Sequence, residues 1–265
     1  MSINTVGIVG AGTMGNGIAQ ACAVSGINVV MVDISQQAVD RGLATVDKSL
    51  DRLLSKEKIT EADKAAALGR IKGSTSYDDL KAAQLVIEAA TENHELKNKI
   101  LKQLDDLLPP EVIIATNTSS ISITQLGAVT GRADRFVGMH FFNPVPMMAL
   151  VEIIRGLQTS DATHDAVKAL AERLGKSPIT VKNAPGFVVN RILVPMINEA
   201  FFVLAEGLAT PEDIDAGMKL GCNHPIGPLA LADMVGLDVC LAVMEVYLEQ
   251  FGDSKYRPCP LLREY

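Results

Sequence analysis

The chain has 265 residues, 48% of them hydrophobic, with 24 lysine and arginine side chains against 31 aspartate and glutamate side chains, a formal net charge of −7. This length allows one large domain or two smaller ones, and the apolar content excludes an intrinsically disordered chain. The negative charge disfavours nonspecific binding to nucleic acid, so any anionic ligand must be held by local basic groups or by backbone amides.

Short β-branched runs alternate with helical patterns over the first two-thirds of the chain. Strands are predicted at TVGIVG (5–10), INVVMVD (27–33), LVIEAA (85–90), EVIIATN (111–117), RFVGMHF (135–141), ALVEII (149–154) and PITV (178–181). Between two of these strands, apolar residues at helical spacing predict one shared face, made of Leu96, Ile100, Leu104, Leu107 and Leu108. The alternation predicts an α/β fold with a doubly wound, mostly parallel sheet and helices on both sides.

The pattern changes near KNAPGF (182–187), after which no strand is predicted. Three helices are predicted there: a long one after Pro185 with an internal Pro195 that should kink it, a short one capped by Thr210 and Gly221 with Pro211 in its first turn, and a third from about Pro228 to Gln250. We therefore predict a first domain over residues 1–184 and a smaller all-helical domain over residues 185–265.

The segment TVGIVGAGTMG places Gly10, Gly12 and Gly15 directly after a strand and at the start of a helix. In a G-x-G-x-x-G turn the glycines allow a tight bend, close approach of a pyrophosphate and close packing of helix on strand. Asp33 ends the next predicted strand. A carboxylate at this place accepts hydrogen bonds from both ribose hydroxyls and repels a 2′-phosphate. The first domain is therefore predicted to be a Rossmann-type domain that binds NAD rather than NADP.

Tyr77 and Lys81 fit the Y-x-x-x-K spacing of a catalytic pair that requires one long helix. They lie in a short connection into a strand, and we interpret the match as chance.

The four cysteines form no C-x-x-C pair and no zinc-like cluster with histidine, so no metal site is expected and a reducing compartment is favoured. We expect a cytoplasmic protein with no membrane partner, since no apolar run reaches roughly 18 residues.

His140 and Glu152 lie on two predicted strands joined by FNPVPMM, and a hairpin could bring them together. A carboxylate beside an imidazole fixes its tautomer, which suits an acid–base group. The alternative is that His140 is a hydrogen-bonded core histidine and Glu152 a charge at a strand end.

Ser119, in TNTSS, follows a predicted parallel strand, at the edge of the sheet where ligands bind. The alternative is that Ser119 caps the next helix. Asn190 lies in the long helix after Pro185, where a polar group needs a partner.

The motifs GAGTMG with Asp33, NTSS, HFFNPVP, Glu152 and PGFVVNR, in this order, resemble the 3-hydroxyacyl-CoA dehydrogenase family, closest to its bacterial short-chain 3-hydroxybutyryl-CoA members. The resemblance covers residues 5–265. It implies oxidation of (S)-3-hydroxybutyryl-CoA to acetoacetyl-CoA, or the reverse reduction, with NAD and a CoA thioester as substrate. It also implies a homodimer formed through the C-terminal domain and further residues after Tyr265.

The resemblance assigns roles to individual residues. His140 is implied to be the general base and Glu152 its orienting partner, while Ser119 and Asn190 hydrogen-bond the substrate oxygen. The implied cofactor-binding residues are Gly10, Gly12, Thr13, Met14, Gly15, Asp33, Glu92, Lys97 and Asn143. The implied CoA-binding residues are Ser49, Arg52, Lys56 and Ser119.

Lys48, Arg52 and Lys56 fall four residues apart and form one basic stripe on a predicted helix. In an acidic protein such a stripe could hold CoA phosphates. The alternative is a solvated face, because Asp47 and Asp51 are close by in the sequence.

Two other functions remain open. Dehydrogenases of free 3-hydroxyacids use a lysine on the first interdomain helix, but here the helix after Pro185 carries Asn190 and Arg191 and has no lysine. A nonenzymatic NAD-binding role is the other alternative, and the presence of His140, Glu152 and Ser119 disfavours it.

Overall fold

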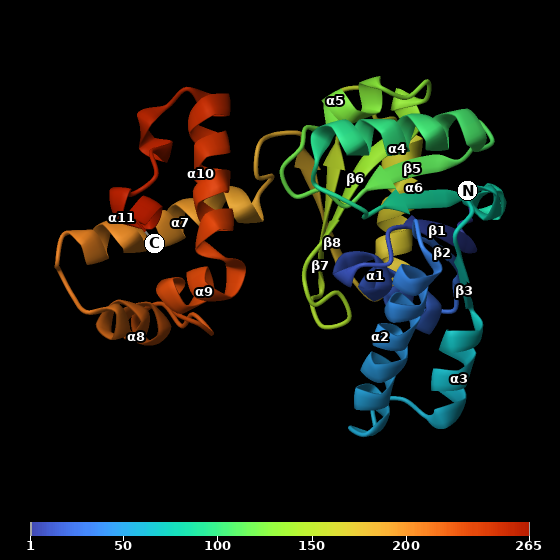
Figure 1. The fold of residues 1–265 in the computed structure, drawn as a ribbon, viewed down its shortest axis with the longest axis horizontal. Helices are drawn as coiled ribbons and strands as arrows, with labels where there is room; N and C mark the ends of the chain where they lie inside the picture. The colour runs from blue at the N-terminus through green and yellow to red at the C-terminus, as the bar shows by residue number, and fades with distance from the viewer. Residues whose placement is uncertain (1, 265) are drawn as a thin grey trace. The chain divides into compact units, whose positions relative to one another are not determined.

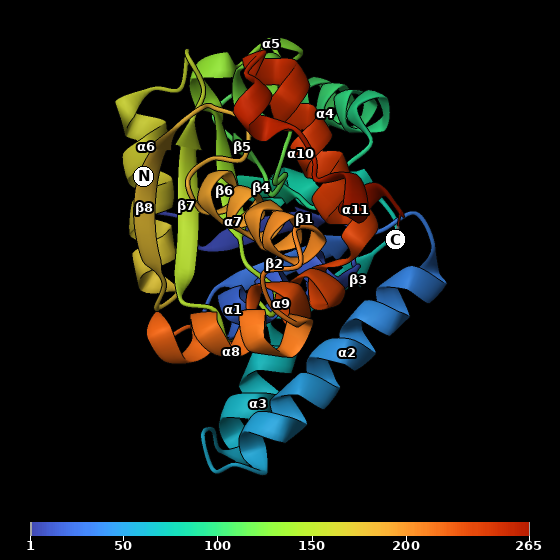
Figure 2. The same cartoon turned by 90° about the vertical axis from the view of Figure 1, so that its left-hand side faces the viewer.

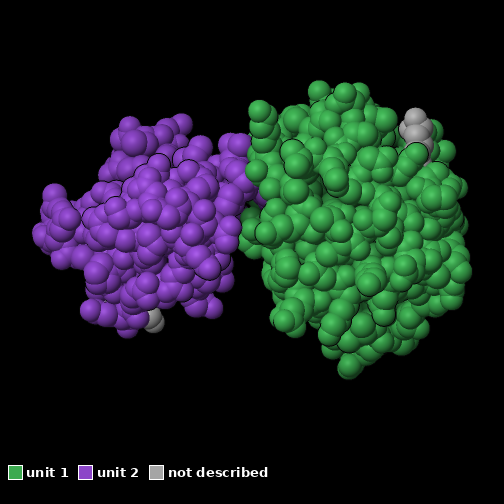
Figure 3. Space-filling view, turned by 90° about the horizontal axis from the view of Figure 1, so that it is seen from above, with its two compact units in different colours: residues 1–183 green, residues 184–265 purple. Residues whose placement is uncertain are grey.

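The structure is a computed structural model that describes residues 2–264. The chain divides into two compact units, residues 1–183 and residues 184–265, which are coloured separately in Figure 3. Each unit has its own apolar core, so each is described by itself.

Within the described residues, the first unit contains an eight-stranded sheet in the order β3-β2-β1-β4-β5-β6-β7-β8 (Figure 1). The strands are β1 (Thr5–Val9), β2 (Asn28–Val32), β3 (Ile71–Ser74), β4 (Leu85–Glu88), β5 (Ile113–Thr116), β6 (Phe136–Phe141), β7 (Leu150–Arg155) and β8 (Ser177–Lys182). Neighbours are parallel except β6 and β7, which are antiparallel. The predicted doubly wound, mostly parallel sheet is confirmed.

Helices cover both faces of this sheet (Figure 1). They are α1 (Thr13–Val24), α2 (Gln36–Leu54), α3 (Glu61–Gly69), α4 (His94–Leu107), α5 (Ile123–Ala128) and α6 (Asp161–Arg173), with short 3-10 turns η1 (Tyr77–Ala82) and η2 (Ala133–Arg135). The main core packs α1, α2, α3 and α6 against one sheet face, with residues such as Ile18, Leu50 and Val167 fully buried. The other face carries α4 and α5, and Ile123 of α5 contacts the sheet at Gly138.

The strand β3 was not predicted from the sequence. Its four residues, IKGS, contain one β-branched side chain, so they lack the apolar run that marks the other strands. It nevertheless pairs with β2 in parallel register, from Ile71 beside Val29 to Ser74 beside Val32. Tertiary pairing therefore overrides a weak local preference here.

The predicted apolar face of α4 was partly wrong. Leu96 is 48% exposed, whereas Leu101, outside the predicted face, is fully buried together with Ile100 and Leu104. Lys97 is also buried on this side of the helix because its ammonium group meets an acidic partner in the sheet. The buried face of α4 therefore includes a charged residue that an apolar pattern cannot predict.

Within its described residues, the second unit contains helices and turns but no strand. Its helices are α7 (Val189–Ala205), α8 (Pro211–Gly221), α9 (Pro228–Val235), α10 (Leu237–Phe251) and α11 (Pro260–Glu264), with a 3-10 turn η3 (Ser254–Tyr256). Pro195 lies inside α7, and Thr210 caps α8 through the backbone amide of Asp213, as predicted. The predicted third helix is instead two helices, because Gly236 adopts φ +105° between them.

Asn198 of α7 has a structural role. Its side chain is 4% exposed, and its Oδ1 accepts from Cys259 N at 2.8 Å while its Nδ2 donates to Arg257 O at 3.1 Å. These bonds tie the segment before α11 to α7. Among the described residues, no helix combines the length and the apolarity that crossing a bilayer requires.

Candidate active site

The glycine-rich turn between β1 and α1 requires glycine at two positions. Gly10 has φ +104°, and a Cβ there would lie 2.7 Å from Ala89 O. A Cβ on Gly15 would lie 1.8 Å from Gly10 O, whereas a Cβ on Gly12 would meet nothing within 4 Å. Neighbouring backbone atoms therefore leave no room for a side chain at Gly10 and Gly15, whereas the space next to Gly12 is open. An exposed turn at the N-terminus of a helix is the arrangement that binds a pyrophosphate.

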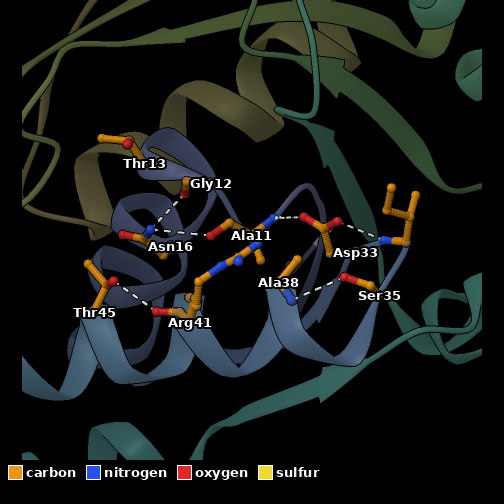
Figure 4. A pocket seen from close by; sticks show the side chains of 11 residues that line it. Ala11, Gly12, Thr13, Asn16, Asp33, Ser35, Ala38, Arg41 and Thr45 are labelled. Carbon is orange, nitrogen blue, oxygen red and sulfur yellow. Dashed lines mark hydrogen bonds between the residues drawn. The ribbon is translucent and has the colours of Figure 1, made fainter.

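Asp33 follows β2 and lies beside this turn (Figure 4). Its Oδ2 accepts from Ala11 N and its Oδ1 accepts from Ile34 N, each at 2.7 Å. These two bonds fix the carboxylate at a cavity of about 430 Å³, whose lining includes Gly12 and Arg41. Carboxylate oxygens have further lone pairs, so Asp33 can also accept hydroxyl groups from a ribose.

A second cavity of about 600 Å³ lies between α1, α2 and the loop that follows β6. Four lining residues, Thr13, Asn16, Arg41 and Thr45, are shared with the Asp33 cavity. Lys48, Ser49 and Arg52 add a polar and basic wall, so the structure brings Ser49 and Arg52 of the predicted CoA set together. Lys56, also predicted, lies beyond the end of α2 and outside the lining of this cavity.

A buried ion pair lies beneath the ends of β4 and β5. Lys97 of α4 binds Glu88, the last residue of β4, and the side chains of these two residues are 1% and 0% exposed. Glu88 also accepts from Thr116 Oγ1 at 2.7 Å and from Ala90 N at 2.9 Å. Lys97 therefore takes part mainly in a structural network, although it also lines a cavity of about 280 Å³ beside Gly12.

Glu92 holds the polar loop that follows β5. Its Oε1 accepts from Ser119 N at 2.7 Å and from Ser119 Oγ at 3.1 Å, and its Oε2 accepts from Thr118 Oγ1 at 2.7 Å. Lys97 Nζ lies 4.0 Å from Glu92. The helix cap of α5 is Ser122 rather than Ser119, so the alternative of Ser119 as an N-cap is wrong.

His140 and Glu152 are direct partners in the antiparallel pair β6–β7. Glu152 is 0% exposed and His140 is 6% exposed. The predicted hairpin therefore does bring the two side chains together: His140 Nδ1 donates to Glu152 Oε2 at 2.7 Å. Since an ionised carboxylate can only accept, this bond places the proton of a neutral imidazole on Nδ1. The ring of Phe142 lies against the imidazole, with centroids 4.5 Å apart.

Lys176, immediately before β8, holds the loop between β6 and β7. Its Nζ donates to Val145 O at 2.6 Å and to Met148 O at 2.8 Å. Partial burial lowers the pKa of Lys176 below its usual 10.5. The loop that Lys176 binds includes Asn143, which was predicted to bind cofactor. Asn143 and Val145 both line the second cavity.

Asn190 lies in the first turn of α7, in the second unit. The preceding Gly186 has φ +75°, and a Cβ there would lie 1.8 Å from Tyr247 Oη. Arg191 stacks on Phe251, with its guanidinium carbon 3.6 Å from the ring centroid. These contacts with α10 explain why the start of α7 needs Gly186 and Arg191.

Three residues that position the site were missed in the sequence. Glu88 was overlooked because it is a single acid in the apolar run LVIE, and Lys176 because its sequence context does not distinguish it from a surface lysine. Asn117 Oδ1 accepts from Phe141 N at 2.9 Å and so joins the end of β6 to the loop after β5. The acid in an otherwise apolar strand was the one signal available, because a buried carboxylate needs partners.

Comparisons with known proteins agree over both units. The family model described as 3-hydroxyacyl-CoA dehydrogenase, NAD binding domain, matches residues 5–184, and the model of the C-terminal domain of the same family matches residues 186–265.

Individual relatives span nearly the whole chain. A 3-hydroxybutyryl-CoA dehydrogenase from Bradyrhizobium diazoefficiens is 52% identical over 263 residues, covering 99% of this chain and 90% of the relative. The mitochondrial hydroxyacyl-coenzyme A dehydrogenase of Rattus norvegicus is 41% identical over 266 residues, covering 97% and 84%. The crystal structure of (S)-3-hydroxybutyryl-CoA dehydrogenase from Ralstonia eutropha superposes with a TM-score of 0.98 at 77% identity, covering 99% and 93%. The chain therefore belongs to the 3-hydroxyacyl-CoA dehydrogenase family of NAD-dependent oxidoreductases.

Proposed function

We propose that the protein interconverts (S)-3-hydroxybutyryl-CoA and acetoacetyl-CoA. The observation that carries this proposal is the buried His140–Glu152 pair. It lies where β6 ends, and this edge of the sheet also carries the nucleotide turn after β1 because β1, β4, β5 and β6 are parallel. The names of several similar proteins, including those from Bradyrhizobium diazoefficiens and Ralstonia eutropha, support this substrate.

His140 is the proposed acid–base group. With Nδ1 donating to Glu152, the neutral ring keeps its lone pair on Nε2, which can take the proton of the 3-hydroxyl group. The carboxylate of Glu152 then stabilises the imidazolium. In the reducing direction the imidazolium returns this proton to the alkoxide at C3. NAD, when bound, supplies the hydride acceptor for the same carbon.

Ser119 is proposed to hold the substrate oxygen. In the structure its hydroxyl donates to Glu92 Oε1 at 3.1 Å. Because a hydroxyl rotates freely, it can donate instead to the substrate oxygen, whose own hydrogen goes to His140. Asn190 is proposed as the second contact to this oxygen, supplied by the helical unit. The (S) assignment is supported by the name of the similar protein from Ralstonia eutropha.

The residues around the glycine turn fit NAD. Gly12 leaves room for the pyrophosphate, and the fixed carboxylate of Asp33 accepts the ribose hydroxyls. Thr13 and Met14 open α1 at this point. Glu92, Lys97 and Asn143 are proposed to line the nicotinamide side, where Glu92 and Lys97 already border a cavity with Gly12.

The CoA portion is proposed to occupy the second cavity. Lys48, Ser49 and Arg52 lie on its α2 wall, and the basic side chains attract phosphates. Lys56 follows the end of α2 and is proposed as a further basic contact outside this cavity. Residues 1–184 thus hold cofactor and substrate, and residues 185–265 are proposed to close over the acyl chain.

A spectrophotometric assay tests this function. NADH absorbance should fall on addition of acetoacetyl-CoA, and the reverse reaction should proceed with the (S) but not the (R) isomer of 3-hydroxybutyryl-CoA. Turnover of free 3-hydroxybutyrate at a comparable kcat/KM would favour the free-acid alternative. A flat trace beside measurable NAD binding would favour a nonenzymatic role.

We also propose a homodimer formed through the helical unit. Apolar side chains on α7, α9 and α10 remain exposed, including Ile192 at 67%, Met234 at 72% and Val239 at 46%. Large exposed apolar side chains gathered on one unit are typical of a protein that forms an oligomer. Light scattering at micromolar concentration should give twice the monomer mass, and a monomer would overturn the proposal.

A further inference from the structure

The helix α2 carries acids and bases in adjacent pairs. Asp47 precedes Lys48, and Asp51 precedes Arg52. Successive residues of an α-helix are rotated by about 100°, so the two acids share one line along the helix and the two bases share another. The sequence alone leaves open whether these charges neutralise one another.

The acidic line of α2 faces α3, which lies alongside it in Figures 1 and 2. Lys64 of α3 bonds both carboxylates, at 2.8 Å to Asp47 and at 2.5 Å to Asp51. Its side chain is 16% exposed, so it is largely enclosed between the two helices. These bonds raise the pKa of Lys64 above its ordinary value, because both carboxylates stabilise the charged ammonium group.

The start of α3 is fixed independently of this contact. Thr60 and Asp63 form a capping box, in which Asp63 N donates to Thr60 Oγ1 at 3.1 Å and Thr60 N donates to Asp63 Oδ2 at 2.9 Å. Lys64 is the next residue, so the box sets the position from which its side chain reaches α2.

The basic line of α2 faces the second cavity. Lys48 and Arg52 border it, together with Arg41 two turns earlier. Within residues 2–264, none of these three side chains forms an ion pair. Asp47 and Asp51 are therefore neutralised on the α3 side of the helix, whereas Lys48 and Arg52 are unpaired on the other side.

We propose that Lys64 is a positioning residue for acyl-CoA binding: it holds Asp47 and Asp51 on the α3 side so that Lys48 and Arg52 remain available to phosphate groups. This role rests on the proposed CoA site. Without Lys64, Asp51 is free to pair with Lys48, three residues earlier, a spacing at which helical side chains meet. Two uncompensated carboxylates would also repel the incoming phosphates.

The test compares two thioesters that differ only in phosphate groups, acetoacetyl-CoA and acetoacetyl-pantetheine. Lys64→Met should raise KM for acetoacetyl-CoA about three- to fivefold, the size expected for two charges within roughly one Debye length of a phosphate. KM for acetoacetyl-pantetheine should not change. The increase in KM for acetoacetyl-CoA, relative to wild type, should become smaller at high salt. Lys64→Gln replaces this variant if Lys64→Met does not fold.

A triple variant separates charge from structure. Lys64→Met combined with Asp47→Asn and Asp51→Asn should restore the wild-type KM for acetoacetyl-CoA, because no carboxylate is then uncompensated. Lys81→Met is the matched control, since Lys81 bonds Asp78 at 2.6 Å elsewhere in the unit. An unchanged KM in Lys64→Met, equal increases for both thioesters, or no restoration in the triple variant would each overturn the role of Lys64.

The underlying site is tested separately by Lys48→Gln combined with Arg52→Gln, using calorimetric titration with CoA so that turnover is not required. Unchanged CoA affinity in this double variant would show that the proposed CoA site is wrong. Weakened affinity there, with wild-type affinity in Lys64→Met, would show that the site is right and the role of Lys64 is wrong.

Discussion

His140 Nδ1 donates to Glu152 Oε2 at 2.7 Å, across directly paired residues of β6 and β7. The sheet register itself thus sets which carboxylate meets the imidazole. A slip of one residue would turn either side chain to the opposite face, so this pair depends on the backbone pairing of the hairpin.

Replacing His140 tests the acid–base assignment. His140→Gln should lower kcat for acetoacetyl-CoA reduction by about 100-fold or more, because general acid–base catalysis typically contributes about 10²–10⁴-fold. KM for NADH should change little, since the imidazole is not part of the proposed nucleotide contacts. Steady-state kinetics give both constants, and a fall in kcat of less than about tenfold would contradict the assignment.

Asp33 should set the preference for NAD over NADP. Asp33→Ser removes the charge that repels a 2′-phosphate, so the ratio of kcat/KM for NADH to that for NADPH should fall by about tenfold or more. Arg41, on the lining of the same cavity, is then available to the phosphate. The two ratios are compared in one assay series, and an unchanged ratio would remove Asp33 from cofactor selection.

The buried pair of Glu88 and Lys97 should be sensitive to the loss of one partner. Lys97→Met leaves a carboxylate that is 0% exposed without its counter-ion, a change that typically destabilises by about 3–5 kcal/mol. Lys97→Met combined with Glu88→Leu should destabilise less, since no charge then remains buried. Urea unfolding of the three proteins measures the difference, and an additive loss in the double variant would be the contrary result.

Gly186 should tolerate no side chain. Gly186→Ala combines φ +75° with a Cβ 1.8 Å from Tyr247 Oη, so we expect a loss of about 3 kcal/mol or more in stability. Gly217→Ala in α8 is the control, because nothing lies within 4 Å of its Cβ and alanine favours helix by about 0.5–1 kcal/mol. Thermal unfolding of both variants should show opposite shifts in Tm.

Cys22 should stay protonated in the folded protein. Burial raises its thiol pKa from 9.0 to about 12. Above pH 9.0 the unfolded chain releases this proton while the native protein keeps it, so the Cys22 contribution to stability is full below pH 9.0 and is lost as pH rises towards about 12. Cys22→Ala should therefore flatten the decline in unfolding free energy above pH 9.0. At neutral pH the exposed Cys222 should react with a thiol reagent and Cys22 should not.

The parts of the fold with strong local signals were predicted from the sequence. The turn at Gly10 and Gly15 and the hairpin carrying His140 and Glu152 each have short-range determinants, namely glycine spacing and two apolar strands joined by prolines. Which charged residues of α2 form ion pairs could not be predicted in this way. It depends on Lys64, which is brought to Asp47 and Asp51 by the packing of α3 rather than by helical spacing.

Other features depended on contacts between distant segments. β3 exists because β2 offers a parallel partner, and Glu88 and Lys97 meet through the packing of α4 on the sheet. Neither contact leaves a periodic trace in the sequence. The break at Gly236 lay within a continuous apolar pattern, since one glycine with positive φ ends α9 without changing the hydrophobicity around it.

Thr13, Asn16, Arg41 and Thr45 line both the Asp33 cavity and the basic cavity beside it. With the cofactor in one cavity and the acyl-CoA in the other, as proposed, the two ligands share a wall through which their binding can be coupled. Whatever factor the bound nucleotide applies to the dissociation constant of the thioester, the thioester must apply to that of the nucleotide. Arg41 is the one charged residue among these four, so it is the first side chain to replace when that coupling is measured.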